Sequence, residues 1–281
     1  MGNFTFLETR WSDLARLGDL SEKYVYNDPN ASVMKQGMLA EVMVKYMLAY
    51  DGIKEPEHDN THANRIRLLK KNDLLPREIN HTLYILRKDR NDAAHEGADE
   101  SEKALNNLQL LYGLCVWFMQ TYGDYNYNPV GYIQPVNITV NLDELERENQ
   151  ELEKQNQTLL VELQRIQKAG KADSTRRAMA YKKALNVKFS EAQTRELIDE
   201  QLRKAGWDAD TTEIRYSKGV RPAKGKNLAI AEWPTDSKTG NGGYADYALF
   251  IGEKIVGIIE AKKKHTNISS VLDSQCKEYA R

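Results

Sequence analysis

The chain has 281 residues, of which 41% are hydrophobic and 29% are charged, and its formal net charge is −1. This composition is that of an ordinary soluble protein of more than one domain, and the near-zero charge excludes a global attraction to nucleic acid. The longest apolar run, residues 110–119, is shorter than the roughly 20 residues of a membrane helix, and no signal-peptide pattern opens the chain. We therefore expect a cytoplasmic protein that does not contact a membrane.

Residues 1–123 are expected to form a helical bundle. Apolar residues recur with helical spacing in four segments, namely residues 33–48, 66–75, 79–86 and 105–118. A stretch rich in Tyr, Asn and Pro, residues 122–135, ends this domain before a short β-like stretch at Val136–Val140.

Residues 124–172 are expected to connect two domains, and residues 142–166 within them show a heptad pattern. Leu142, Asn149, Asn156 and Leu163 fall at position a, and Leu145, Leu152, Leu159 and Ile166 fall at position d. The pattern predicts a coiled coil, in which asparagine at a favours a defined parallel pairing and hence self-association. The same apolar stripe can also lie on a neighbouring domain of one chain, and both interpretations stay open.

Residues 173–281 are expected to form an α/β domain. A basic helical stretch at residues 175–185 precedes a helix that starts after Ser190, where Gln193 completes a capping-box pattern, and that stops at Gly206. The pattern of apolar and turn residues then predicts four strands and a last helix, near residues 213–216, 228–233, 244–251 and 254–262, and at residues 269–279.

Two acids and a lysine lie on the last two of these strands. Asp246 is followed, after one strand-turn-strand interval, by Glu260 and Lys262. Because side chains alternate along a strand, Glu260 and Lys262 share one face. Mg²⁺ prefers carboxylate and carbonyl oxygens, and an ammonium group beside it can orient a water molecule or offset charge on a phosphate. The pattern therefore predicts cleavage of phosphodiesters.

The hairpin between these strands decides whether the two acids meet. A tight two-residue turn at Gly252-Glu253 places Asp246 opposite Ile259 and sends Glu260 to the other face of the sheet. Asp246 lies opposite Glu260 if the loop has three residues, Gly252–Lys254, or if a bulge elsewhere adds one residue to a strand. Loosely splayed strand ends would also bring the acids together.

The last third of the chain resembles the PD-(D/E)xK nucleases, and more closely the N-terminal nuclease region of the R subunit of type I restriction-modification enzymes. Five segments carry the resemblance in the expected order: residues 229–234, the Gly-rich 240–243, 244–250, 259–263, and Gln275 to Tyr279 as a Q-x-x-x-Y motif. It implies a multi-domain protein of α and α/β class: an N-terminal helical bundle, a coiled-coil linker and an α-β-β-β-α nuclease core.

The resemblance also implies roles for individual residues. Asp246, Glu260 and the Ala261 carbonyl would hold Mg²⁺, and Lys262 would assist the water molecule. Gln275 and Tyr279 would position the site or the DNA. Glu191, in the first turn of its helix, either joins the metal site or only interacts with the helix dipole.

A type I R subunit also needs an ATP-driven translocase, and no phosphate-binding G-x-x-x-x-G-K-[ST] segment occurs in this chain. The resemblance therefore implies a longer protein, in which ATP serves only the motor and duplex DNA is cleaved together with methylation and specificity subunits. The alternative is a non-catalytic fragment that binds DNA or the other subunits.

Basic residues near the predicted site are candidates for binding DNA phosphates. They are Arg195, Arg215, Lys218, Arg221, Lys224, Lys226, Lys263 and Lys264. For the group from residue 215 to 226, a solvated loop without DNA contacts is the alternative.

The helical domain carries a motif of its own, because Arg90 and His95 have the spacing R-x4-H. This spacing resembles the motif of HEPN-type RNases and of the HEPN-like or DUF4145-like helical domains that are sometimes attached to restriction subunits. It implies either an RNase site at Arg90 and His95 or a structural role in which these side chains connect helices. We favour the structural role.

Overall fold

The computed structural model describes residues 2–55, 58–96, 101–137, 147, 159, 161–170, 173–235 and 243–260. The chain divides into two compact units, Met1–Phe189 and Ser190–Arg281. The first unit is helical and the second contains a helix and a sheet, so the mixture of α and α/β domains expected from the sequence is observed.

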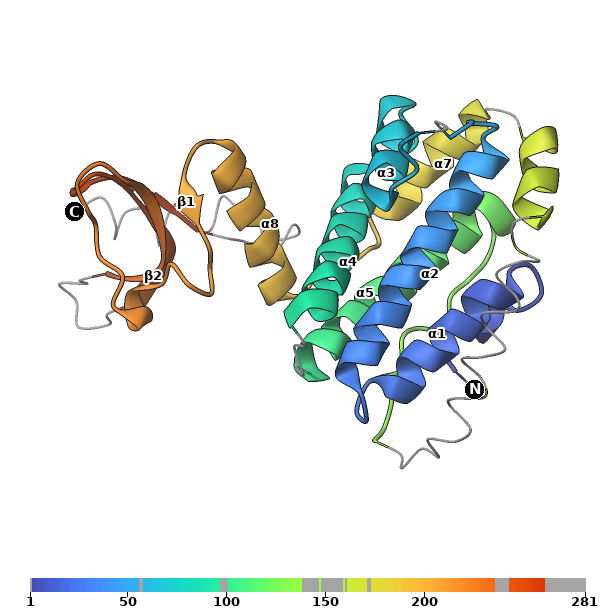
Figure 1. Ribbon diagram of the computed structural model, residues 1–281, viewed down its shortest axis with the longest axis horizontal. Coiled ribbons are helices and arrows are strands. Elements are labelled where there is room, and N and C mark those ends of the chain that lie inside the picture. The colour runs from blue at the N-terminus through green and yellow to red at the C-terminus, as the bar shows by residue number, and fades with distance from the viewer. Residues whose placement is uncertain are drawn as a thin grey trace. The chain divides into compact units, whose positions relative to one another are not determined.

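The first unit is a helical bundle in which α2 contacts α1, α3, α4 and α5 (Figure 1). Its elements are η1 (Thr5–Leu7), α1 (Ser12–Tyr24), α2 (Pro29–Tyr50), α3 (His62–Lys71), α4 (Arg77–Glu96), α5 (Ser101–Phe118), η2 (Met119–Gly123) and α7 (Ser174–Ala184). Residues 161–169 are also helical. Over the described ranges, no helix is both long and apolar enough to span a membrane.

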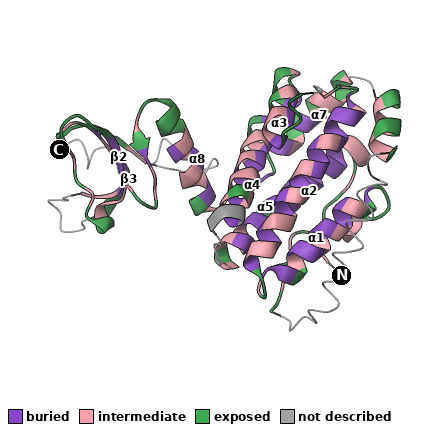
Figure 2. Cartoon of the chain, in the orientation of Figure 1, coloured by how far each residue is buried: buried purple, intermediate pink, exposed green. Residues whose placement is uncertain are grey.

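The central helix α2 starts where local chemistry favours a start. The Asp28 side chain accepts a hydrogen bond from the Ala31 amide at 2.8 Å, and Pro29 occupies the first turn. Figure 2 shows buried residues along the visible side of this helix. The buried positions recur on more than one side of it, which is the pattern of a helix enclosed by others. The expected helix at residues 66–75 ends earlier, at Lys71, since Asp73 adopts a left-handed backbone conformation with φ of 58°.

The boundary between the units lies at Phe189/Ser190, whereas the sequence analysis places the start of the last domain at residue 173. The reason is α7, whose Ala180 and Ala184 are buried in the first unit. Trp117 donates a hydrogen bond from Nε1 to the Ala180 carbonyl at 2.8 Å. The many basic residues of α7 hide this small apolar stripe in the sequence.

Most of the expected coiled coil, residues 142–166, lies outside the described residues. In the described part, Leu159 is buried and Gln167 donates a hydrogen bond from Nε2 to the Ile53 carbonyl at 3.0 Å. This part therefore packs against the helical unit, in line with the interpretation that the stripe lies on a neighbouring domain. Of the β-like stretch Val136–Val140, residues 136 and 137 are in no regular element, and the others are not described.

The second unit places α8 (Glu191–Lys204) on one face of a mixed sheet (Figure 1). The strands β1 (Asp208–Ala209), β2 (Asn227–Thr235), β3 (Gly243–Ile251) and β4 (Lys254–Ile259) are neighbours in this order. The β1–β2 pair is parallel, and the β2–β3 and β3–β4 pairs are antiparallel. The expected last helix, residues 269–279, lies outside the described residues.

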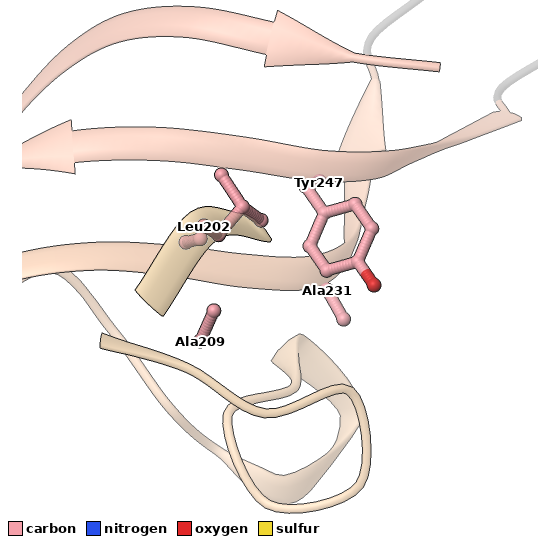
Figure 3. Close-up of a cluster of buried hydrophobic side chains, with 5 residues drawn as sticks. Leu202, Ala209, Ala231 and Tyr247 are labelled. Carbon is pink, nitrogen blue, oxygen red and sulfur yellow. The ribbon is translucent and has the colours of Figure 1, made fainter. Parts of the chain in front are cut away.

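Buried side chains fill both faces of this sheet. On the α8 face, Leu202 packs with Ala209, Ala231 and Tyr247 (Figure 3). On the other face, Ile230, Ala248 and Phe250 pack against the segment that contains η3 (Tyr216–Lys218). The sheet is therefore covered on both sides, which leaves its strand ends as the place for polar side chains.

Two local expectations for this unit have different outcomes. The capping box at the start of α8 is confirmed, because the Ser190 hydroxyl accepts from the Gln193 amide while the Gln193 side chain accepts from the Ser190 amide. The strand expected at residues 213–216 is wrong: only Arg215 forms a bridge, with Ala231. The Asp210 carboxylate accepts hydrogen bonds from the Thr212 and Glu213 amides, so this segment turns instead of extending.

The turn between β3 and β4 generates a stability prediction that compares two glycines. Gly252 has φ of 62°, so Gly252→Ala should destabilise the hairpin by about 1 kcal/mol. Gly257 lies in β4, and a Cβ there would meet Leu249 Cδ1 at 3.7 Å, an ordinary contact. We expect Gly257→Ala to leave stability unchanged or to raise it slightly.

Amide hydrogen exchange along β3 and β4 of the full chain measures both effects. Faster exchange in Gly252→Ala together with unchanged or slower exchange in Gly257→Ala is the expected result. Equal acceleration in both variants would show that the turn conformation does not govern the hairpin.

Candidate functional site

A β-bulge in β4 brings the two predicted acids to corresponding positions. The turn at Gly252-Glu253 has two residues, since Ile251 pairs with Lys254. Farther along, Leu249 pairs with Gly257 while Phe250 pairs with Ile255, so Val256 is the extra residue. The register is shifted by one from that point to the last pair of the hairpin.

That last pair is Tyr247 with Ile259, so the next residues along the two strands are Asp246 and Glu260. Side chains directly opposite each other have Cβ atoms about 4.5–5.5 Å apart and project from the same face. The bulge anticipated from the sequence is confirmed, and the three-residue loop is not formed. The register thus brings the positions of these two acids together at one end of the β3–β4 hairpin.

Arg195 of α8 connects three acids at this place. Its guanidinium lies 3.0 Å from Asp246 Oδ1, 3.0 Å from Glu191 Oε1 and 3.0 Å from Glu232 Oε1. The Arg195 and Asp246 side chains are 17% and 18% exposed, so their ion pair is largely shielded from water, whereas Glu191 is exposed. Burial opposes the charge of Arg195, but the three carboxylates outweigh it and raise the pKa of the guanidinium above its ordinary value.

Glu232 is a site residue that the sequence analysis does not identify. It has φ of 51°, a left-handed conformation that is rare for residues other than glycine. Ala231 packs on the α8 face of the sheet, whereas Trp233 packs on Phe250 in the other cluster. Because residues two apart normally share a face, the conformation of Glu232 reverses the alternation of β2.

This reversal places the Glu232 carboxylate between two arginines. One Glu232 oxygen contacts both Arg195 and Arg215. Burial acts against the charged form, but the hydrogen bonds from these guanidinium groups prevail and lower the pKa of Glu232 below its usual value. An acid at the end of the apolar run at residues 228–231 is the one sequence signal that could have pointed to this residue.

A buried hydrogen-bond network supports α8 beside the acids. The Tyr247 hydroxyl donates to the Arg195 carbonyl at 3.1 Å and lies 2.9 Å from Asp199 Oδ1 and 2.6 Å from Thr211 Oγ1. The Asp199 carboxylate also accepts from the Thr211 amide at 2.7 Å. Figure 3 shows the Tyr247 ring beside the buried side chains of Leu202, Ala209 and Ala231. Tyr247 is the neighbour of Asp246, so the network fixes the helix relative to the strand that carries the acid.

The remaining candidate residues have diverse surroundings. Lys218 pairs with Glu213 at 2.7 Å, and the Arg221 guanidinium lies 3.7 Å from the centre of the Tyr216 ring. Lys224 and Lys226 are exposed. Six of the predicted site residues lie outside the described residues: Ala261, Lys262, Lys263, Lys264, Gln275 and Tyr279.

In the first unit, Arg90 forms contacts between helices. Its guanidinium lies 2.7 Å from Glu41 Oε2, and Arg65 lies 2.9 Å from the other oxygen of the same carboxylate. Gly37 of α2 leaves room for the aliphatic part of Arg90, because a Cβ there would lie 2.4 Å from Arg90 Cδ. Arg90 therefore connects α4 to α2. The side chain of His95 lies outside the described part, so the RNase interpretation stays untested.

The donor set suits a hard divalent cation. Asp246 and Glu260 supply carboxylate oxygens, the ligands that Mg²⁺ prefers, and Mg²⁺ commonly binds through one or two carboxylates with the rest of its shell from water and substrate. Across the residues that the structure describes, no group of three or more His, Cys, Asp and Glu side chains is arranged to hold a metal ion. The described site thus offers two carboxylates and a guanidinium that is bound to one of them.

Comparison with known proteins relates both units to families. Residues 208–281 match the family described as the second domain of the type I restriction enzyme EcoKI endonuclease subunit. Residues 21–161 match a domain of unknown function, DUF4145. No solved structure matches the chain.

A curated relative covers nearly the whole chain. The chain is 30% identical over 327 residues to the type I restriction enzyme EcoKI endonuclease subunit of Escherichia coli strain K12. The match includes 96% of this chain and 27% of the relative, so the chain spans about a quarter of the length of that protein. With its DUF4145 region followed by an endonuclease-subunit domain, the chain belongs to the family of type I restriction enzyme R subunits and corresponds to their N-terminal region.

Proposed function

We propose that the second unit is a Mg²⁺-dependent endonuclease domain of PD-(D/E)xK type that cleaves duplex DNA. The observation that supports this proposal most is the register of β3 and β4, in which Tyr247 pairs with Ile259, so that Asp246 and Glu260 are the next residues along the two strands. A pair of acids on neighbouring strand ends is what a phosphodiesterase needs to hold one cation against a phosphate.

Each residue of the site has a role in this proposal. Asp246, Glu260 and the carbonyl of Ala261 would hold Mg²⁺. The bound cation would polarise the phosphate and make a water molecule more acidic. Lys262 would orient that water molecule or offset the developing negative charge. Gln275 and Tyr279, four residues apart on the expected last helix, would position the site or the DNA.

Arg195 has a further role in the same proposal. Glu191, Glu232, Asp246 and Glu260 carry four negative charges, and Arg195 and Arg215 carry two positive ones. Among the described residues, two negative charges therefore remain, which match the charge of one Mg²⁺ ion before Lys262 is counted. We infer that Arg195 neutralises Asp246 while the metal is absent and turns toward Glu191 and Glu232 when the metal is bound. Glu191 then affects the metal through Arg195, and direct coordination is the alternative role.

The wider setting is also proposed. The relative is named as the endonuclease subunit of a type I restriction enzyme, and such an assembly would contain methylation and specificity subunits and an ATP-driven translocase on the rest of the polypeptide. Lys218, Arg221, Lys224 and Lys226 would contact DNA phosphates from the segment before β2, with Lys263 and Lys264 after β4. An interaction of this kind weakens as the salt concentration rises.

Substitutions in the complete enzyme test the proposed chemistry. We expect Asp246→Ala or Lys262→Ala to lower the rate of DNA cleavage by at least about 100-fold, because each removes a group that acts on the reacting phosphate. ATP hydrolysis should stay near normal, since the motor is a different domain. Supercoiled plasmid cleavage and phosphate release measure the two activities.

Glu200→Gln is a matched control, because it removes a carboxylate from α8 that forms an ion pair with Lys204 and takes no part in the contacts of Arg195. It should cleave normally. Cleavage by Asp246→Ala at the normal rate would refute the nuclease assignment. Loss of ATP hydrolysis in a folded variant would contradict the separation of the two domains.

The role of Arg195 predicts a change in metal affinity. Arg195→Gln removes a positive charge that competes for Asp246, so the variant should bind Mn²⁺, a probe for Mg²⁺, on the order of tenfold more tightly. Calorimetric titration of the full chain with Mn²⁺ measures this affinity without any need for turnover. Lys204→Gln removes one positive charge from an exposed position on the same helix and should change the affinity little. Unchanged or weaker binding by folded Arg195→Gln would contradict the proposed exchange.

A further inference from the structure

The first unit contains a cavity that the proposed nuclease function does not use. Its volume is about 880 Å³, and its walls come from α5, η2, the segment at residues 125–132 and the end of α7 with the residues that follow it. Binding sites for small ligands typically have volumes of about 300–1,000 Å³. The space is therefore large enough for a molecule of the size of a nucleotide.

Aromatic side chains form much of the wall. Tyr112, Trp117 and Tyr125 line the cavity, together with Tyr127 and Tyr132. Contacts between rings hold several of them in place: the Tyr127 ring stacks on Phe6, which is not part of the wall, with centroids 5.0 Å apart, and the rings of Tyr112 and Tyr132 lie 5.7 Å apart within the wall. Rings that are already fixed can stack on a planar ligand at little cost in conformational entropy.

A buried amide gives the cavity an unsatisfied acceptor. Gln120 is 4% exposed and lies in η2, a π-helical turn of a kind that is frequent at functional sites. Its Nε2 donates to the Tyr127 carbonyl at 2.8 Å, which fixes the orientation of the amide. Its Oε1 is buried without a hydrogen-bond partner among the described residues. Such a group is costly unless a donor reaches it, and Gln120 lines the cavity from which a ligand could supply one.

The charges of the wall favour an anionic ligand. Lys183 and Lys188 line the cavity, and the described lining residues include no acid. Lys183 is half-buried and Lys188 is exposed. A ligand that satisfies all three features has a flat ring, a hydrogen-bond donor and a negative charge.

We propose that this cavity binds a nucleotide, with the base between the tyrosine rings, a base N–H donating to Gln120 Oε1, and the phosphate beside Lys183 and Lys188. The ligand can be a free mononucleotide or one nucleotide of a single strand, because both present the same base and phosphate. The site belongs to the DUF4145 region and the residues that pack on it, and it is independent of the metal-binding carboxylates.

Calorimetric titration of the full chain with AMP, CMP, GMP and UMP tests the proposal. EDTA is present throughout, so that the proposed metal site does not contribute and failure of one proposal leaves the other intact. At least one nucleotide should bind with saturation at one site. Ribose 5-phosphate, which has the phosphate without the base, should bind at least about tenfold more weakly, because base–aromatic stacking contributes about 1–3 kcal/mol.

Two variants and a matched control locate the site. Tyr125→Ala and Lys183→Ala should each weaken nucleotide binding by about tenfold, whereas Lys182→Ala, which removes the preceding lysine from outside the wall, should leave it unchanged. Circular dichroism confirms that each variant is folded. Competition by a ten-residue oligonucleotide identifies a single strand as the source, and its absence identifies the free nucleotide.

Three results would overturn the proposal. The first is no saturable binding of any nucleotide up to millimolar concentration. The second is equal binding of ribose 5-phosphate, which would show a simple anion site. The third is normal binding by both Tyr125→Ala and Lys183→Ala, which would place the ligand elsewhere on the chain.

Discussion

The alternation of side chains along a strand is the constraint on which the candidate site depends. Because neighbouring residues of a strand point to opposite faces, one residue in the count of β4 decides whether Glu260 lies with Asp246 or on the other side of the sheet. With the two-residue turn at Gly252-Glu253 alone, Asp246 would lie opposite Ile259. The extra residue of the bulge, Val256, shifts the register by one, so that Asp246 and Glu260 occupy corresponding positions. The bulge thus sets the register on which the proposed site depends.

A second constraint is electrostatic. Acids that converge on one strand end repel each other, and the ion pairs of Arg195 with Glu191, Glu232 and Asp246 offset that repulsion. The unfavourable backbone of Glu232 persists because its carboxylate binds two arginines. The hydrogen bonds of Tyr247 with Asp199 and the Arg195 carbonyl hold the helix in the place from which Arg195 reaches the acids. Geometry and charge therefore support each other at this site.

Features that depend on local chemistry could be predicted from the sequence, and features that depend on tertiary contacts could not. The start of α8 follows from Ser190 and Gln193, and β2 and β3 follow from apolar runs, so these elements lie where the sequence places them. The left-handed conformation of Glu232 has no local signature in the sequence, and its carboxylate contacts two arginines that are distant along the chain. The place of α7 in the helical unit also depends on tertiary contacts, namely the burial of Ala180 and Ala184 and the hydrogen bond from Trp117, so the sequence does not predict it.

The candidate site itself was predictable in part. The order of Asp246 and Glu260 indicated the acids, and strand alternation showed that the register required either a longer loop or a bulge. The sequence does not distinguish the longer loop from the bulge, because each adds one residue to the hairpin and produces the same register at Asp246. The sequence predicts that Arg195 binds DNA, but in the structure its guanidinium forms ion pairs with three acids of the same chain. That prediction stays open for the state in which metal and DNA are bound.

Cross-linking of β3 to β4 tests the central claim most directly, because a disulfide forms only between cysteines whose Cα atoms lie within about 7 Å and whose side chains point toward each other. Asp246→Cys combined with Glu260→Cys, with Cys276→Ser to remove a competing thiol, should oxidise readily to an intramolecular disulfide. The matched pair Asp246→Cys with Ile259→Cys should not. Disulfide formation in the second pair and not in the first would show that the bulge is absent and that the two acids lie on opposite faces of the sheet.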